Sequence, residues 1–316
     1  MTLGVGPGIG KTFWLAEADS AYETMLLERG IPSTEIAHTL VAAEDMTTAN
    51  RNDVVLVMPG TYTETAKTTW DKNSTHLIGC GSPNQRIPAT AGTSGNVYFP
   101  CTTAMTELLL ISGHHCIFKN FSTYLSTATG IADIRVQGRN TLLENVFMKS
   151  GQNATQLASA ILGYALYCDD GAAGYCNGLT VKNCHIGDPR NTVRTDGGMI
   201  YMKGVYNAGM CYEFHNCFIS GWTETAGVSI VYQSGNYSCD RYVLWNNCVF
   251  YNFYTNLGGI LTAGVFNDTC GTTHMNILTG STCQYGWNVW GNNDGFMFGV
   301  LPQANAAGGK LVTMTG

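Results

Sequence analysis

The sequence is poor in charged residues, which make up only 12% of its 316 positions, about half the usual share. The formal net charge is -6, and no run of basic residues is present. Proteins that bind nucleic acid neutralise phosphates with clustered Lys and Arg side chains. We therefore expect no nucleic-acid partner.

Long apolar runs are also lacking. No stretch reaches the roughly 18 apolar residues that a membrane-spanning helix needs, so no membrane insertion is expected. The first residues, MTLGVGPGIGKTFW, lack the charged start and apolar core of a secretory signal. The sequence thus predicts synthesis in a host cytoplasm without export.

Metal-ligand spacing is absent as well. The twelve cysteines include no C-x-x-C pair, and zinc sites usually contain such close pairs. Disulfides are rare in a reducing cytoplasm, so the cysteines are expected to be free thiols. The sequence predicts no metal site, no cofactor-binding residues and no cofactor.

Glycine and small polar residues are abundant instead. The chain has 38 glycines, many Thr, Ser and Asn residues, and 45% apolar residues. This mixture favours a β-rich protein with a sizeable core and many tight corners.

A repeat runs through the middle of the chain. Five segments align on an Asn followed by an apolar residue or Cys, and apolar and polar residues alternate on both sides of the Asn, which is typical of strands. The spacings between these Asn residues are 25, 38, 33 and 31 residues. The segments are CIFKNFSTY, TLLENVFMK, LTVKNCHIG, YEFHNCFIS and VLWNNCVFY, with a weaker sixth match around Asn276.

Further short strands are expected 11 to 15 residues after most of these Asn residues, at 159–166, 198–205, 227–234 and 258–265. Repeats of this length and content indicate a solenoid, in which one coil cannot bury its inner face without its neighbours. Stacked coils place equivalent side chains above one another. Inward-turned Asn side chains at a corner would then form a hydrogen-bonded ladder, and the next residues would form a core stack. The predicted ladder is Asn120, Asn145, Asn183, Asn216 and Asn247, and the predicted stack is Phe121, Val146, Cys184, Cys217 and Cys248; exposed turn Asn residues are the alternative.

The stretch RNDVVLVMPGTYTET (51–65) resembles the first full coil of right-handed parallel β-helix proteins of the pectate-lyase-like superfamily. Asp53, Pro59, Gly60, Tyr62 and Glu64 carry the match, and the later Asn segments resemble later coils. The resemblance implies an all-β, right-handed parallel β-helix, a solenoid that opens with a helical cap. It implies little about function, because the fold is found in lyases, hydrolases, adhesins and viral spikes.

The flanking segments complete the expected organisation. Residues 12–30 and 33–46 have helical periodicity and predict the cap, which would cover the apolar end of the solenoid. We divide the chain into an N-terminal arm and helical cap (1–48), a parallel β-helix (49–299) and a C-terminal tail (300–316).

Asp169-Asp170 is the best catalytic candidate in the sequence. Paired carboxylates can act as acid and base or hold a cation. Asp188, Arg190, Arg194 and Asp196 follow in the next corner loop and could form a sugar site with the pair. The sequence lacks the Gly-His-Gly and Arg-Ile-Lys patterns of polygalacturonases and the Arg-x-Pro-x-x-Arg pattern of pectate lyases, so no catalytic residue is predicted.

Aromatic residues crowd the later coils, from Tyr232 to Tyr254, and some must face outward. They could stack on sugars or bury themselves against another subunit; the few charges favour a subunit contact. The sequence favours a non-enzymatic structural protein of a virus particle, a phage capsid decoration protein or a short spike. Its expected location is the virion, and its expected partners are itself as a homotrimer, capsid or tail proteins, and surface glycans. The alternatives are a polysaccharide lyase or glycoside hydrolase acting on an acidic glycan, and a glycan-binding module.

Overall fold

The computed structural model describes residues 10–81, 96–149, 154–169, 176–187, 195–203, 211–223, 228–234, 242–252, 264–268, 275–285, 289–291 and 296–298. These residues form two parallel sheets that run along the length of the molecule, one of 17 strands and one of eight. We call them sheet A and sheet B.

Sheet A consists of β1 (Thr12–Leu15), β2 (Ile36–Ala37), β3 (Asp53–Val57), β4 (Gly60–Thr61), β6 (Thr75–Gly79), β7 (Val97–Cys101), β9 (Ile117–Leu125), β11 (Leu142–Met148), β13 (Leu179–Lys182), β14 (His185–Ile186), β16 (Cys211–His215), β17 (Phe218–Gly221), β19 (Tyr242–Asn246), β20 (Val249–Asn252), β22 (Met275–Thr279), β23 (Cys283–Tyr285) and β25 (Phe296–Phe298). Sheet B consists of β5 (Thr68–Trp70), β8 (Glu107–Ile111), β10 (Ala132–Val136), β12 (Tyr164–Asp169), β15 (Ile200–Lys203), β18 (Val231–Ser234), β21 (Gly264–Asp268) and β24 (Val289–Gly291).

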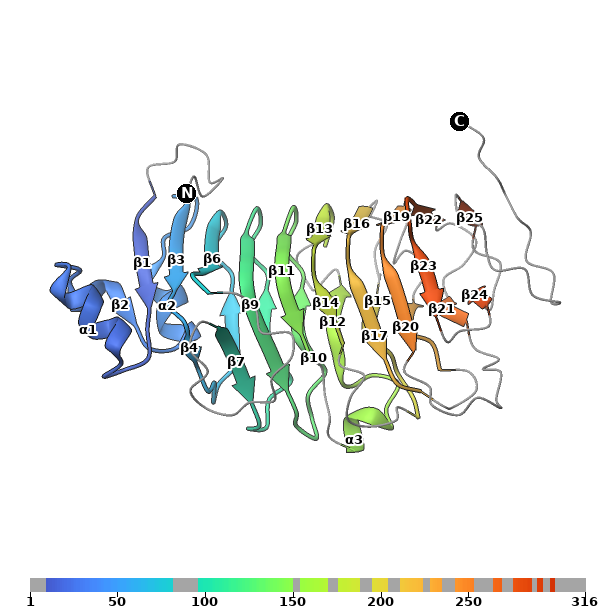
Figure 1. The fold of residues 1–316 in the computed structure, drawn as a ribbon, viewed down its shortest axis with the longest axis horizontal. Helices are drawn as coiled ribbons and strands as arrows, with labels where there is room; N and C mark the ends of the chain where they lie inside the picture. Colours follow the sequence, from blue (N-terminus) through green and yellow to red (C-terminus); the bar gives the residue numbers. More distant parts are fainter. Residues whose placement is uncertain are drawn as a thin grey trace.

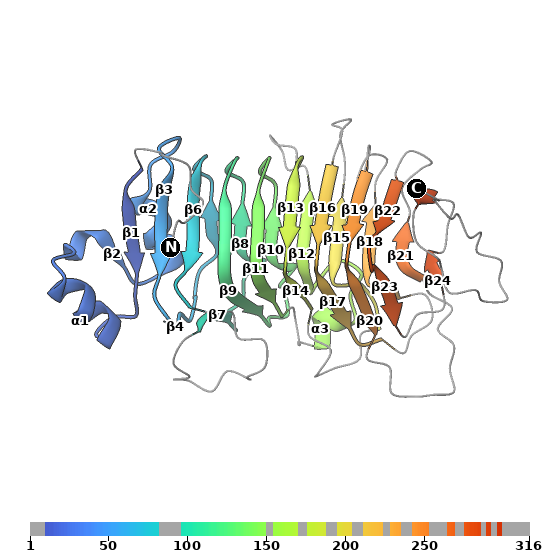
Figure 2. The same cartoon turned by 45° about the horizontal axis from the view of Figure 1, so that its top comes forward.

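Each coil adds its strands in parallel to those of the preceding coil. For example, β16 pairs with β13 and β19, β17 pairs with β14 and β20, and β18 pairs with β15 and β21. The strands therefore stack into a rod, with the first coils at one end and β24 and β25 at the other (Figure 1; Figure 2). This arrangement confirms the predicted parallel β-helix.

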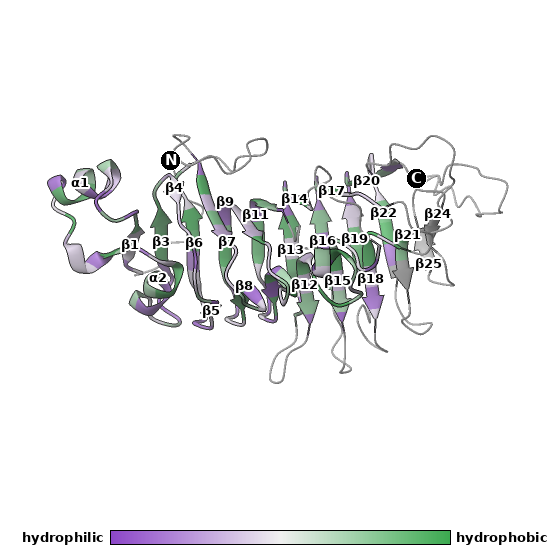
Figure 3. Cartoon of the chain, turned by 90° about the horizontal axis from the view of Figure 1, so that it is seen from below, coloured by the Kyte–Doolittle hydropathy of each residue, from purple (hydrophilic) through white to green (hydrophobic). Residues whose placement is uncertain are grey.

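The core lies between the two sheets and is continuous along the rod. Inward residues of successive coils pack directly on one another, as Phe214 stacks on Trp245 with ring centroids 4.2 Å apart, and both are fully buried. Hydrophobic and hydrophilic stretches alternate along the strands (Figure 3), as expected when one side of each strand faces the core.

The N-terminal end carries the helices, but the predicted helix over 12–30 is partly wrong. Thr12–Leu15 form strand β1, which pairs in parallel with β3, and the helix α1 covers only Ala21–Glu28. The Phe-Trp-Leu segment instead pairs with the exposed edge of the first full coil, where its backbone groups find partners. The sheet thus begins within the range 1–48 that we assigned to the arm and cap.

The second predicted helix, over 33–46, is also interrupted. A short 3-10 turn (Ser33–Glu35) and β2 precede the helix α2 (Leu40–Met46). Thr39 caps α2 by accepting from the Ala42 N–H at 3.2 Å, and Glu64 accepts from the Leu40 N–H at 3.1 Å. The buried Glu64 therefore ties the cap to the first coil.

Residues 1–9 and 299–316, which include most of the predicted arm and the predicted tail, lie outside the described residues. Over the ranges that the structure describes, no helix has the length and apolar character needed to cross a membrane.

Candidate functional site

The predicted ladder residues lie at one corner of the rod, where each coil turns from one strand of sheet A to the next. All five have a left-handed backbone, with φ between 51° and 61° as for Asn120 (61°) and Asn183 (53°). Asn tolerates this conformation better than most residues. The side chains are half-buried or exposed, so they are not turned into the core as expected.

These Asn side chains are nevertheless hydrogen-bonded from coil to coil. Asn145 donates to Asn120 at 2.8 Å, Asn216 donates to Asn183 at 3.1 Å, and Asn247 donates to Asn216 at 3.2 Å. Every amide donates toward the N-terminal end, and Asn120 closes that end by donating to the Gly79 carbonyl at 3.3 Å.

The ladder has a gap between Asn145 and Asn183. Although their strands are in register, no hydrogen bond joins these two described side chains. The gap falls at the longest spacing of the repeat. The ladder therefore consists of two separate segments.

The weak sixth match, Asn276, is not part of the ladder. It is buried in the core, where it accepts from Trp245 Nε1 at 3.0 Å and exchanges hydrogen bonds with Gln233. Gly280 and Ser281 occupy the corner instead. A Cβ at Gly280 would lie 2.1 Å from Asn247 Oδ1, so glycine is required there, and the Ser281 N–H continues the ladder to Asn247 at 2.8 Å.

The residues after the Asn positions form a buried column. Phe121, Val146, Cys184, Cys217 and Cys248 are at most 2% exposed. Val146 pairs with Phe121, and Cys217 lies between Cys184 and Cys248, within reach of both thiols. Within the described ranges these cysteines are free thiols.

Each thiol of this column satisfies two carbonyl groups that the corner leaves unpaired. Cys217 Sγ lies 3.4 Å from the His215 carbonyl in its own coil and 3.5 Å from the Val181 carbonyl in the preceding coil. Cys248 and Cys184 repeat this arrangement one coil later and one coil earlier. A thiol is small and apolar but still a weak donor, which explains the repeated Asn-Cys pairs.

Hydroxyl groups do the same work at equivalent positions. Thr282, which follows the Gly280 corner, donates to the Trp245 carbonyl at 2.9 Å and to the Thr279 carbonyl at 2.7 Å. At a second corner of the rod, Cys116 and Thr75 follow left-handed residues and bond to carbonyls in the same way. A hydroxyl or thiol donor after the left-handed residue is therefore a recurrent feature of these corners.

The thiols of the column are unreactive by environment. Burial raises the pKa of Cys217 well above its ordinary value, and the hydrogen bond with Cys217 and burial raise the pKa of Cys248. Since the thiolate is the nucleophile, this column is suited to packing rather than chemistry.

The catalytic candidate Asp169 ends strand β12 and is 5% exposed. Arg135, one coil earlier on β10, donates to Asp169 Oδ2 from Nη2 at 2.5 Å and from Nε at 3.2 Å. Asp170, Asp188, Arg190 and Arg194 lie outside the described residues, so the structure does not bring them together with Asp169. Asp196 is described, and its side chain accepts from the Gly197 N–H.

Arg135 also lies 3.6 Å from Glu107, which Lys67 approaches at 3.4 Å. Burial alone would lower the pKa of Arg135, but the hydrogen bond to Asp169 and the nearby negative charges raise it. Asp169 Oδ1 and Glu107 Oε2 are buried without a hydrogen-bond partner. The four side chains form an alternating ion-pair network on the outer face of sheet B.

The sequence analysis did not identify Arg135, Glu107 or Lys67. A signal was present: when ADIRVQG (132–138) is aligned with YALYCDD (164–170), Val136 matches Cys168, as in the structure. Arg135 then falls one position before the coil neighbour of Asp169.

A row of tyrosines continues this face. Tyr167, Tyr201 and Tyr232 are aligned on successive coils, and Arg135 lies 5.2 Å from the centre of the Tyr167 ring. Tyr201 stacks on Tyr164 with centroids 5.0 Å apart and shares a hydrogen with Ser234 at 2.5 Å. Tyr201 and Tyr232 remain half-buried, so part of this aromatic row faces outward.

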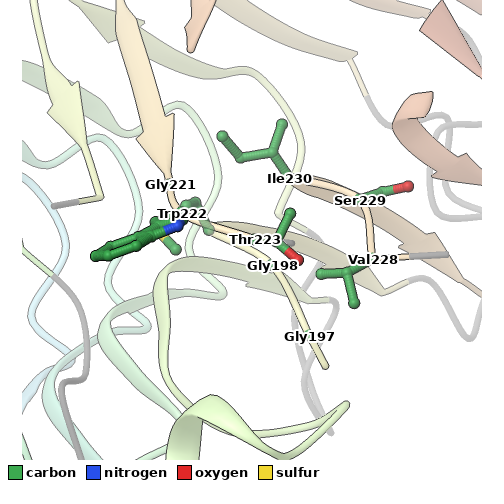
Figure 4. Close-up of a pocket in the computed structure, with 9 residues that line it drawn as sticks. Gly197, Gly198, Gly221, Trp222, Thr223, Val228, Ser229 and Ile230 are labelled. Carbon is green, nitrogen blue, oxygen red and sulfur yellow. The ribbon is translucent and has the colours of Figure 1, made fainter. Parts of the chain in front are cut away.

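A small pocket lies beside the row, at the turn that leads into β18. It encloses about 190 Å³ and is lined by Gly197, Gly198, Met199, Gly221, Trp222, Thr223, Val228, Ser229 and Ile230. Trp222 extends away from the turn that carries Val228 and Ser229 (Figure 4). None of the nine lining residues is charged, so the pocket offers little for catalysis. Among the described residues, no three His, Cys, Asp or Glu side chains are placed to hold a metal ion.

Comparisons with known proteins add to the fold. No protein-family model matches the sequence, and no curated protein is significantly similar to it. The structure is similar to that of a pectate lyase, Pel9A, with a TM-score of 0.54 and 14% identity over 87% of this chain and 63% of that one. It thus spans less than two thirds of the pectate lyase.

Two further structures are similar. A pectin methylesterase in complex with a hexasaccharide has a TM-score of 0.50 and 13% identity, with 87% of this chain and 80% of that chain covered. The tailspike protein gp49 of Acinetobacter baumannii bacteriophage Fri1, a capsular polysaccharide depolymerase, has a TM-score of only 0.26 and 12% identity, over 77% of this chain and 51% of that chain. At these identities the first two structures show a shared β-helix fold and no shared activity.

Proposed function

We propose that this chain is a non-enzymatic structural protein of a virus particle, either a capsid decoration protein or a short spike of phage type. The observation that carries the proposal is the repeated bonding at the corners of the rod. Asn amides, thiols and hydroxyls link coil to coil from Gly79 to Ser281. Such a chain invests its polar residues in holding a rod together.

The state of Asp169 supports the same role. Its carboxylate is almost completely buried, and Arg135 neutralises it. A general acid or base must reach the proton that it transfers. Asp169 serves as one member of a structural ion-pair network.

Two measurements test this proposal. Peptides of the chain should be found by mass spectrometry in gradient-purified particles from its source, in a fixed ratio to the major capsid protein. The purified protein should release neither reducing ends nor unsaturated sugars from polygalacturonate. Cleavage by the unaltered protein that is lost in Asp169→Asn, with the melting temperature retained, would establish an enzyme instead.

A second candidate function is glycan binding on the outer face of sheet B. The tyrosine row favours it, because half-exposed Tyr rings next to a polar network resemble a surface on which sugar rings can stack. Affinity electrophoresis in gels with dextran or polygalacturonate would detect binding as retarded migration. Tyr201→Ala should abolish the retardation and Tyr251→Ala, on sheet A, should not; equal retardation of both variants would reject this surface.

A further inference from the structure

The corner that carries the Asn ladder is the smoothest edge of the rod. Only two residues separate the sheet A strands there: Asn183 and Cys184 between β13 and β14, Asn216 and Cys217 between β16 and β17, and Asn247 and Cys248 between β19 and β20. The other connections of these coils are longer, as at 187–199, 222–230 and 235–241. From β9 onward, no long connection lies at this corner in the part of the chain that the structure describes.

Two outward faces of sheet A meet at this corner. The first-strand face carries a half-buried apolar row, Leu142, Leu244 and Ile277, with Thr180 and Glu213 between them in register. Its charged residues are mostly paired within the face, as Lys119 with Glu144 at 2.6 Å and His215 with Glu213 at 3.2 Å. Paired charges make such a face less costly to cover.

The second-strand face is aromatic. Phe147 stacks on His185 at 4.3 Å, His185 contacts Phe218 edge-on at 4.9 Å, and Phe218 stacks on Tyr251 at 5.9 Å. His185, Phe218 and Tyr251 are half-buried in the single chain. Aromatic residues are enriched in the cores of protein interfaces.

We propose that these faces join three copies of this chain into a closed ring of parallel rods, with the first-strand face of one copy packed against the second-strand face of the next. The two faces differ, so the contact is heterologous and can close into a ring. Strands β9 and β11 run without interruption through Asn120 and Asn145, so the bend between the faces is obtuse. At most three obtuse wedges fit around one axis, which fixes the ring at three copies.

The area of the faces is sufficient for such a ring. Strands of four to five residues are about 15 Å wide, and six coils from β9 to β22 extend about 29 Å, which gives about 430 Å² per face. One contact then covers about 900 Å² of flat area, and side-chain relief raises the accessible area above the roughly 1,000 Å² of a specific interface. The inference depends only on the chain's own surface, so it can hold or fail independently of the virion role.

Light scattering after size exclusion tests the ring. The protein should have about three times its 34.0 kDa chain mass, and the charge introduced by Leu244→Lys or by Phe218→Lys should each reduce the mass about threefold. Ile161→Lys, at a residue that is 64% exposed and outside both faces, is the matched control and should leave the mass unchanged. Retained far-UV circular dichroism and melting temperature would show that the variants fold.

Mixing the two variants tests the pairing of unlike faces. Each variant keeps one intact face, so Leu244→Lys and Phe218→Lys together should form a dimer of two chains although each alone is a monomer. The inference is overturned by a monomeric unaltered protein, by variants that keep the full mass, or by a mixture that remains monomeric. Finding the chain in particles while it is a monomer would overturn the ring and leave the proposed function standing.

Discussion

The buried column beside the Asn corner is built differently in the two halves of the rod. In the N-terminal coils it holds Phe121 and Val146, and Phe121 packs edge-on against Phe99 at 5.6 Å. In the C-terminal coils it holds three thiols, each of which lies within hydrogen-bonding distance of two carbonyls. The same backbone position is thus filled by bulk in one half and by weak donors in the other.

The difference teaches how a corner can be repeated without a fixed sequence. A left-handed residue turns carbonyl groups out of the strand ladder, and buried carbonyls without donors are costly. Thiols and threonine hydroxyls solve this problem where the column is narrow. The gap between Asn145 and Asn183 lies where the two solutions meet, since Cys184 is the first thiol of the column and reaches back to the Leu143 carbonyl at 3.7 Å.

The largest expected effect concerns acid, and it should separate the two halves. His76 lies on β6 in the N-terminal half, is 3% exposed, and has no partner for Nδ1. Burial lowers its pKa from 6.5 to about 4. The unfolded chain therefore binds this proton more tightly, so the stabilising contribution is present above pH 6.5 and is lost as the pH falls toward 4.

The loss should reach about 3 kcal/mol at pH 4. Hydrogen exchange at pH 7 and pH 4, corrected for the intrinsic rates, should show faster opening of the coils around β3, β6 and β9 than of those around β16 and β19. His76→Leu fits between Val54 and Ile117 in the same row and should reduce this difference. An equal acid response in the variant would exclude His76 as its cause.

The next effect breaks the ladder itself. Asn216 has bonds to Asn183 and Asn247 and a left-handed backbone with φ of 53°. Asn216→Ala loses both bonds and strains the backbone, at an expected cost of about 2–3 kcal/mol, whereas Asn216→Gly loses the bonds without the strain and should cost about 1 kcal/mol. Denaturation in guanidinium chloride measures both values.

Asn145 provides the control at the gap in the ladder. It has one ladder bond, to Asn120, so Asn145→Gly should cost less than Asn216→Gly. An equal loss at the two positions would mean that the bonds do not act as separate segments.

Much of this architecture could be predicted from the sequence, because the solenoid repeats. The Asn positions gave the register of the coils, and the cysteine stack followed from it. The cap was harder: Phe13 and Trp14 read as a helix start, and their pairing with β3 depends on an open sheet edge that local periodicity does not reveal. The Asp169 contact was missed for a related reason, since Arg135 belongs to a coil without an Asn-Cys pair to mark its register. The αL role of Gly280 was hidden by one additional residue at that corner.

The smallest effect distinguishes bulk from hydrogen bonding in the thiol column. Thr and Val have nearly the same shape, but only Thr can donate to the carbonyls of His215 and Val181 that Cys217 now contacts. Cys217→Thr should therefore retain about 1 kcal/mol more stability than Cys217→Val. Thr282 already fills the equivalent position one coil beyond Cys248, which shows that the corner accommodates this side chain. If Val were the better replacement in guanidinium chloride denaturation, the column would be selected for apolar volume, and the two halves of the rod would differ in size of side chain rather than in kind of bond.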